Sequence, residues 1–304
     1  MHLLLYVETT NLARALAIAA CAVAALLRSA TASAQESPYI VTYDHYLEEP
    51  GNLEIEWFSL FATQQGGNDF HAFWVELEYG VKAWWTTELY LDGQTTFNDS
   101  TLFTGFRWEN RFKLLKREHV VNPVFYVEYE QISDADKILK EIEGHDVQAD
   151  QAPPNSVLAS TINHELEFKL LLSTTWKGWN VAVNPLMTKN LSPNDPLEFG
   201  YAIGVSRVLG QRASPNACTL CFENFIVGAE LYGGLGDTEQ FGFANTSHYL
   251  APVMAWNLPS GWTVRFSPGF GLNGNSHRLL IRAGISREVS GFGDRVSRIF
   301  EGRQ

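Results

Sequence analysis

Apolar residues alternate with polar or small residues along most of the chain from residue 53 onward. Within residues 70–79, Phe73 and Val75 share one face of an extended chain, whereas Glu76 and Glu78 share the other. Successive side chains of a β-strand point to opposite sides, so each such segment has one apolar and one polar face. The alternation therefore predicts an all-β protein.

Twelve segments carry this pattern, and most are near the roughly ten residues that a tilted strand needs to cross a bilayer. An even number of strands is typical of single-chain bacterial barrels. Every apolar run beyond residue 34 is broken by charges within a few residues, so a membrane location would require a closed sheet. We therefore predict an antiparallel up-and-down transmembrane β-barrel over residues 53–287, with strands at 53–63, 70–79, 82–92, 101–114, 122–131, 163–176, 179–189, 197–208, 224–234, 247–258, 262–272 and 276–287.

The alternative fold is an exported β-sandwich or a lipocalin-like barrel, which would turn its apolar face inward. That fold has no need of aromatic residues near strand ends, whereas membrane barrels place aromatic girdles at the two interfaces. Seven aromatic residues lie on or beside the apolar faces, mostly near strand ends: Trp57, Tyr79, Trp85, Trp108, Tyr129, Trp256 and Trp262. Their positions favour the membrane barrel.

The N-terminus has the features of a secretory signal peptide. An apolar run at 15–27 is followed by Ala32-Ser33-Ala34, an A-x-A cleavage site. We predict that residues 1–34 are removed on export and that the mature chain lies in a bacterial outer membrane. The expected partners are outer-membrane lipid and lipopolysaccharide, with the barrel assembly machinery and periplasmic chaperones during biogenesis.

The charge balance of the chain excludes one class of partner. The chain has 22 basic and 34 acidic residues, a net charge of −12. Nucleic-acid-binding proteins instead present basic surfaces to the phosphate backbone. We therefore expect no nucleic-acid partner.

The lengths of the links predict which regions lie on each side of the membrane. Bacterial barrels alternate short periplasmic turns with longer external loops. Counted along the chain, the tight links Gly80-Val81 and Lys177-Gly178 are the second and sixth, whereas the longest link is the fifth. The even-numbered links are therefore predicted to be periplasmic turns and the odd-numbered links external loops. Both termini should then be periplasmic. The expected regions are a periplasmic N-terminal segment at 35–52, an external loop at 132–162, a cysteine-containing periplasmic link at 209–223 and a periplasmic tail at 288–304.

Cysteine usage fits export. Cys218 and Cys221 are close in sequence and are predicted to form one local disulfide. Neither a haem-attachment signature nor a second cysteine pair for zinc accompanies them. Cys21 could instead belong to a lipoprotein box, but apolar residues continue past it.

The polar strand faces must line the lumen of such a barrel. Reading the phase of each strand gives the following charged residues as a candidate constriction: Glu54, Glu56, Glu76, Glu78, Glu88, Arg107, Glu109, Arg111, Glu128, Glu130, Glu165, Glu167, Lys169, Glu198, Glu230, Arg265, Arg278 and Arg282.

The placement of the basic residues predicts ion pairs across the sheet. Arg107 and Arg111 lie on the fourth strand, between strands that carry Glu88 and Glu128. Opposite charges on neighbouring strands can pair. Acids outnumber bases, which indicates either a cation-preferring constriction or a salt-bridged interior that fills a small barrel.

Closure of the barrel would bring the last strand beside the first. Arg278 and Arg282 would then pair with Glu54 and Glu56. Elsewhere, glycine and alanine on the inner faces of three later strands could leave space for a solute or an inserted loop. The loop at 132–162 is the candidate for such an insertion.

The sequence also contains candidate residues for a metal site and for a hydrolase. His71, His164, His248 and His277 lie near strand starts, but each shares the phase of apolar residues, so they are not predicted to converge on a metal. A cross-strand pair of Ser276 with His248 could support a lipid hydrolase on the outer surface. No acidic group is evident at the right phase to orient the histidine.

Several stretches resemble bacterial outer-membrane barrel proteins assigned as transporters near aromatic-degradation pathways. They are EFGYAIG at 198–204, ELYGGLG at 230–236, TSHYLAP at 246–252 and SPGFG at 267–271. The resemblance implies a barrel and a transport role, and it carries no catalytic residues or cofactor. The leading hypothesis is a narrow channel for small solutes; the alternatives are an adhesion barrel acting through its external loops and an outer-membrane lipid hydrolase.

Overall fold

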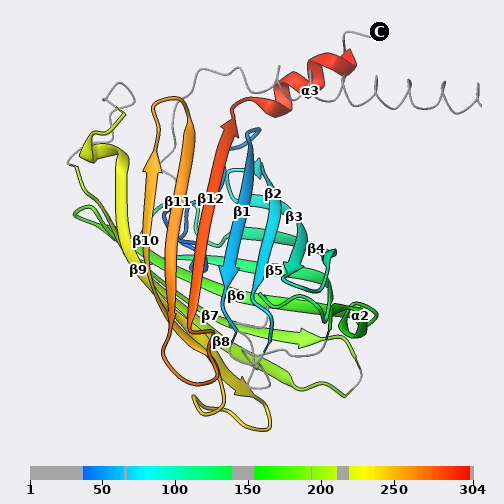
Figure 1. Ribbon diagram of the computed structural model, residues 1–304. Helices are drawn as coiled ribbons and strands as arrows, with labels where there is room; N and C mark the ends of the chain where they lie inside the picture. Colours follow the sequence, from blue (N-terminus) through cyan, green and yellow to red (C-terminus); the bar gives the residue numbers. More distant parts are fainter. Residues whose placement is uncertain (1–36, 65–66, 139–153, 193, 211–218, 302–304) are drawn as a thin grey trace, which may run out of the picture.

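Twelve antiparallel strands close into a single barrel in the computed structural model (Figure 1), which describes residues 37–301 except 65–66, 139–153, 193 and 211–218. Each strand pairs with its neighbours in sequence, and β12 pairs with β1. The strands are β1 (Leu53–Ala62), β2 (Phe70–Lys82), β3 (Trp85–Thr96), β4 (Thr101–Lys113), β5 (Asn122–Ser133), β6 (Ile162–Trp176), β7 (Trp179–Asn190), β8 (Leu197–Val208), β9 (Phe225–Asp237), β10 (His248–Asn257), β11 (Trp262–Gly271) and β12 (Leu279–Val289). The short helices are α2 (Asn155–Leu158), η2 (Phe222–Asn224) and α3 (Phe292–Glu301).

All twelve predicted strands are present, and the largest errors are at β3 and β12. β2 runs through Gly80, which was predicted to be a turn residue, with a register shift between Gly80 and Lys82. Gly80 has a different role, because a Cβ atom there would lie 2.1 Å from the carbonyl oxygen of Glu49. The missing side chain therefore makes room for another part of the chain inside the barrel.

The barrel is apolar outside, and its interior holds many charged side chains together with a buried apolar cluster that includes Leu60, Phe70 and Leu280. Large apolar side chains on the outer face are strongly exposed, including Trp57 at 47%, Trp108 at 53% and Phe103 at 65%. A water-soluble sandwich or lipocalin-like barrel would bury such residues, so this arrangement is that of a membrane barrel. Among the described residues, no helix is long and apolar enough to cross a membrane.

The start of β1 and the end of β12 lie at the same end of the barrel, which we call the terminal end. Leu53 is paired with Val289 in the register of β1 with β12, and α3 continues from there. The chain enters β1 through a tight turn in which the N–H of Gly51 donates to Gly80 O at 2.7 Å, and Gly51 adopts a φ of +85°. This turn directs the preceding residues back into the lumen.

Residues 37–49, which we call the inserted segment, lie inside the barrel. Thr42, Asp44 and His45 are 4%, 6% and 1% exposed and contact inward-facing side chains of the wall. The predicted periplasmic placement of residues 35–52 is therefore wrong for this part. The polar composition of the segment is compatible with both the periplasm and the lumen. Only contacts with wall residues far away in the sequence show that it lies in the lumen.

The loop after β5 also turns inward where it is described. Gln94 on β3 donates from Nε2 to Ala135 O at 2.8 Å, and its Oε1 accepts the N–H of Lys137 at 3.1 Å. Ile138 and Val41 of the inserted segment both pack against the same buried apolar cluster and line one cavity. The prediction that this loop folds inward is correct for residues 134–138, and residues 139–153 of the predicted loop lie outside the described residues.

Some sequence predictions fall outside the described residues. The signal peptide at 1–34 and Cys218 are among them. Cys221 is disulfide-bonded, in keeping with the predicted staple in the link between β8 and β9.

Candidate functional site

The barrel wall holds the inserted segment mainly through its backbone. Glu230 on β9 is 1% exposed, and its carboxylate accepts the N–H groups of Val41 at 2.9 Å and Thr42 at 2.6 Å. The N–H of Ile40 points at the same carboxylate at 3.3 Å. Hydrogen bonds to a charged acceptor are stronger than neutral ones, so Glu230 is the principal anchor.

Asn184 and Ser173 fix the next part of the segment. Asn184 on β7 accepts the N–H of Tyr43 at 2.6 Å and donates to Tyr43 O at 3.0 Å. Ser173 on β6 accepts the N–H of His45 at 2.8 Å. The Asn184 amide thus satisfies both backbone groups of Tyr43, as a neighbouring strand would. The segment is held in the lumen in this way without becoming a strand of the sheet.

One of the small residues predicted to leave space in the lumen, Gly204, does so for the segment. Tyr39 packs on Gly204 of β8, where a Cβ atom would lie 2.6 Å from the ring. The Tyr39 hydroxyl donates to Asn180 Oδ1 at 3.0 Å. Arg265 on β11 donates from Nε to Ser37 O at 2.9 Å. The space on this side of the lumen is therefore occupied by the protein itself.

The opposite side of the lumen carries a row of glutamates paired directly across successive strands. This glutamate ladder consists of Glu288 on β12, Glu54 on β1, Glu78 on β2, Glu88 on β3, Glu109 on β4, Glu128 on β5 and Glu167 on β6. Like charges placed directly opposite on neighbouring strands are destabilising. The ladder therefore needs compensating charge, and the barrel supplies part of it.

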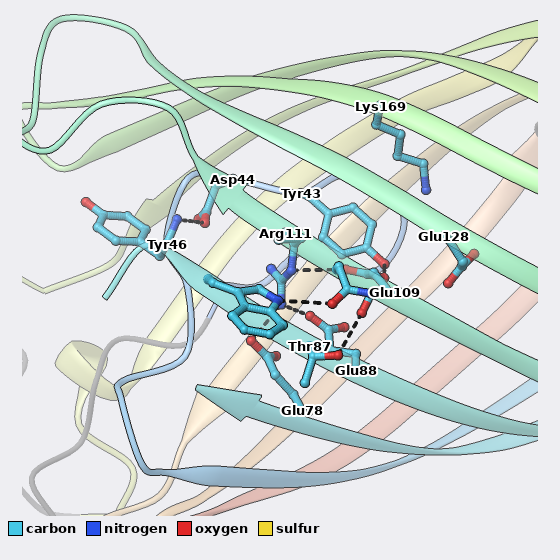
Figure 2. A network of polar contacts seen from close by, with 12 residues as sticks. Tyr43, Asp44, Tyr46, Glu78, Thr87, Glu88, Glu109, Arg111, Glu128 and Lys169 are labelled. Atoms are coloured by element: carbon cyan, nitrogen blue, oxygen red, sulfur yellow. Dashed lines mark hydrogen bonds and ion pairs between the residues drawn. The ribbon is translucent and has the colours of Figure 1, made fainter. Parts of the chain in front are cut away.

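Arg111 supplies the central compensation (Figure 2). Its guanidinium contacts Glu78 at 2.6 Å and Glu109 at 3.0 Å, and it also contacts Glu88. Tyr43 of the inserted segment lies against this group, with its hydroxyl donating to Glu109 at 3.1 Å. The segment and the ladder therefore form one polar network.

Two further bases extend this compensation along the ladder. Arg107 pairs with Asp92 at 3.0 Å and lies 3.7 Å from Glu128, and Lys169 pairs with Glu167 at 2.6 Å. Pairing of the fourth-strand bases with acids of their neighbours was predicted and is observed.

The pairing predicted at closure is wrong. Glu56 is paired with Arg265 of β11, and Arg282 contacts the hydroxyl of Tyr232. The reason is register, because Arg282 lies opposite Leu60, farther from the terminal end than Glu56. Arg278 is exposed and does not line the lumen. It lies in the link before β12, because that strand begins one residue later, at Leu279.

The other predicted lumen residues lie on the inward face. Four of them are half-buried: Glu76, Arg107, Glu165 and Glu198. Thirteen are buried: Glu54, Glu56, Glu78, Glu88, Glu109, Arg111, Glu128, Glu130, Glu167, Lys169, Glu230, Arg265 and Arg282.

The inserted segment adds acids that the sequence analysis did not assign to the lumen. Burial raises the pKa of Asp44 to about 6, partly offset by the backbone N–H of Tyr46. Burial, reinforced by Glu54 and Glu288, raises the pKa of Glu48 to about 8. Burial is the main cause of both pKa shifts, and only that of Glu48 is increased further by neighbouring carboxyl groups.

The predicted pairing of Ser276 with the His248 imidazole is not formed. The Ser276 hydroxyl accepts the backbone N–H of His248 at 2.8 Å and donates to its carbonyl at 2.9 Å. The His248 ring instead contacts Thr246 at 2.8 Å and Tyr201 at 3.1 Å. This arrangement is a structural cap on β10 and not a nucleophile–base pair.

No family model matches the sequence, and no curated protein matches it. Solved structures are similar in fold. The COG4313 outer membrane channel from Pseudomonas putida F1 has a TM-score of 0.54 at 10% identity, covering 82% of this chain and 100% of that one. The KdgM porin has a TM-score of 0.45 at 8% identity, and its complex with disordered oligogalacturonate 0.48 at 9%; both cover 77% of this chain and 98% of the porin. The first of these shows that the fold is that of an outer-membrane β-barrel.

Proposed function

We propose that this protein is an outer-membrane channel for small solutes, with a preference for cations, that is held closed by its inserted segment. The observation that carries the proposal is the glutamate ladder along a lumen that the segment occupies. Rings or rows of carboxylates favour cation entry in narrow pores. A barrel whose interior served only to fill space would have no reason to place like charges opposite one another.

Two parts of the chain occupy the lumen and close it. The inserted segment crosses the lumen, and Ile138 of the loop after β5 lines the same cavity as Val41 of the segment. Among the described residues, cavities of about 130 Å³ and 90 Å³ lie beside the segment. Spaces of this size hold a few water molecules, since one water occupies about 30 Å³ of liquid. Conduction therefore requires the segment to move.

Removal of residues 37–49 should yield a cation-selective pore. With the wall intact and a chelator present, the deletion variant should pass potassium several-fold more readily than chloride. The measurement is the reversal potential in a planar bilayer under a potassium chloride gradient. A small aromatic cation and its anionic counterpart test the solute class suggested by the sequence resemblance.

A matched variant identifies the source of the selectivity. Glu88→Gln together with Glu109→Gln in the deletion background should reduce the reversal potential without reducing the conductance to zero. Anion preference in the deletion variant, or selectivity unaffected by these two substitutions, would contradict the proposal.

A further inference from the structure

The larger cavity lies between the inserted segment and strands β1 to β3, and it is strongly acidic. Asp44 and Glu48 of the segment line it together with five glutamates of the wall. Among the residues that the structure describes, two cationic side chains, Arg111 and Arg265, line the same cavity. A space of about 130 Å³ therefore faces seven carboxyl groups and two bases.

The smaller cavity provides an internal comparison. Its acids are Glu128, Glu130 and Glu167, and its bases are Arg107, Lys169 and Arg282. One oxygen from each of these three glutamates also lies within 4.8 Å of the others, but among the described residues the three bases balance their charge. The excess of acid is a property of the larger cavity and not of the lumen as a whole.

The carboxylates of the larger cavity are arranged to share an ion. One oxygen from each of Glu76, Glu78 and Glu88 lies within 4.8 Å of the others. Glu54 lines the same cavity directly opposite Glu78, and it is 5% exposed. Its buried Oε1 has no hydrogen-bond partner among the described residues. A buried carboxylate oxygen without a donor is costly unless a cation satisfies it.

We propose that this cavity binds one divalent cation of the calcium class through Glu54, Glu76, Glu78 and Glu88. The donors are all oxygen atoms, and none of the described residues lining the cavity is histidine or cysteine. Calcium accepts six to eight oxygen ligands in irregular geometry, whereas magnesium demands a near-octahedral set and zinc favours nitrogen or sulfur. Arg111 stays between Glu78 and Glu88 as the second counter-charge.

The ion also has a consequence for the segment. Asp44 and Glu48 reach the same cavity from the inserted side, so the ion reduces their repulsion from the wall carboxylates. Calcium thus stabilises the closed barrel. This site concerns the closed form and stands whether or not the open form conducts.

The experiment uses the full-length folded protein, stripped with EDTA and titrated with calcium chloride by calorimetry and thermal unfolding. The unmodified protein should bind one calcium ion and unfold at a higher temperature when it is bound, because a ligand selective for the folded state stabilises it. Glu54→Gln with Glu76→Gln should weaken calcium binding at least tenfold. Glu130→Gln, in the balanced cavity, should leave binding unchanged.

Three results would overturn the site. They are the absence of saturable one-to-one binding, equal weakening by Glu130→Gln, and tighter binding of magnesium than of calcium. A fourth test does not depend on binding. In EDTA the double variant should be at least as stable as the unmodified protein, since it removes unpaired charge; a lower unfolding temperature would show that the protein alone already satisfies these carboxylates.

Discussion

Replacing Glu230 with alanine is expected to increase the open fraction of the channel at least 30-fold. The substitution removes the acceptor for the N–H groups of Val41 and Thr42. Each buried donor left unsatisfied costs about 1–3 kcal/mol, so the loss of two gives at least about 2 kcal/mol, or roughly 30-fold in the ratio of inserted to withdrawn segment. Single-channel recording of the open fraction measures this ratio directly.

The matched control is Glu239→Ala. Glu239 is exposed in the loop that follows the same strand, so it changes the net charge equally without touching the segment. Its open fraction should equal that of the unmodified protein. Equal open fractions for Glu230→Ala and the unmodified protein would mean that the carboxylate does not hold the segment in place.

Replacing Arg111 with methionine is expected to destabilise the barrel by about 3–5 kcal/mol, the usual cost of removing one partner from a buried ionic group. Arg111 is 7% exposed and contacts three carboxylates of the glutamate ladder. Methionine keeps much of the side-chain volume, so the loss is one of charge and hydrogen bonding. The measurement is the free energy of unfolding in urea, in detergent micelles or lipid vesicles.

Arg278→Met is the control for this substitution. Arg278 is exposed in the link between β11 and β12, so its loss should change the free energy of unfolding by less than about 0.5 kcal/mol. If both substitutions lower the free energy of unfolding by the same amount, the glutamate ladder is neutralised by protonation or by ions and not by Arg111.

The strands and their faces could be predicted from the sequence because period-two alternation is a local signal. Phe73 and Glu76 show it without knowledge of any partner strand. The inward placement of Arg107 and Arg111 followed from phase alone, and so did their pairing with acids on neighbouring strands.

What could not be predicted depends on register and on contacts far apart in sequence. The ladder exists because Glu88 lies exactly opposite Glu78 on one side and Glu109 on the other, and a shift of one residue would send each side chain to the other face. The inserted segment escaped prediction because its partner Glu230 is about 190 residues away. One local clue was available, since the glycines at 80 and 204 interrupt inward faces where the segment packs.

The central claim is that residues 37–49 close the barrel from within. The most direct test is the single-channel conductance of the unmodified protein beside that of the variant lacking residues 37–49, reconstituted in the same bilayer after both are shown to be folded. We expect the unmodified protein to be closed most of the time and the deletion variant to conduct steadily. Equal, steady conductance of the two proteins would contradict it.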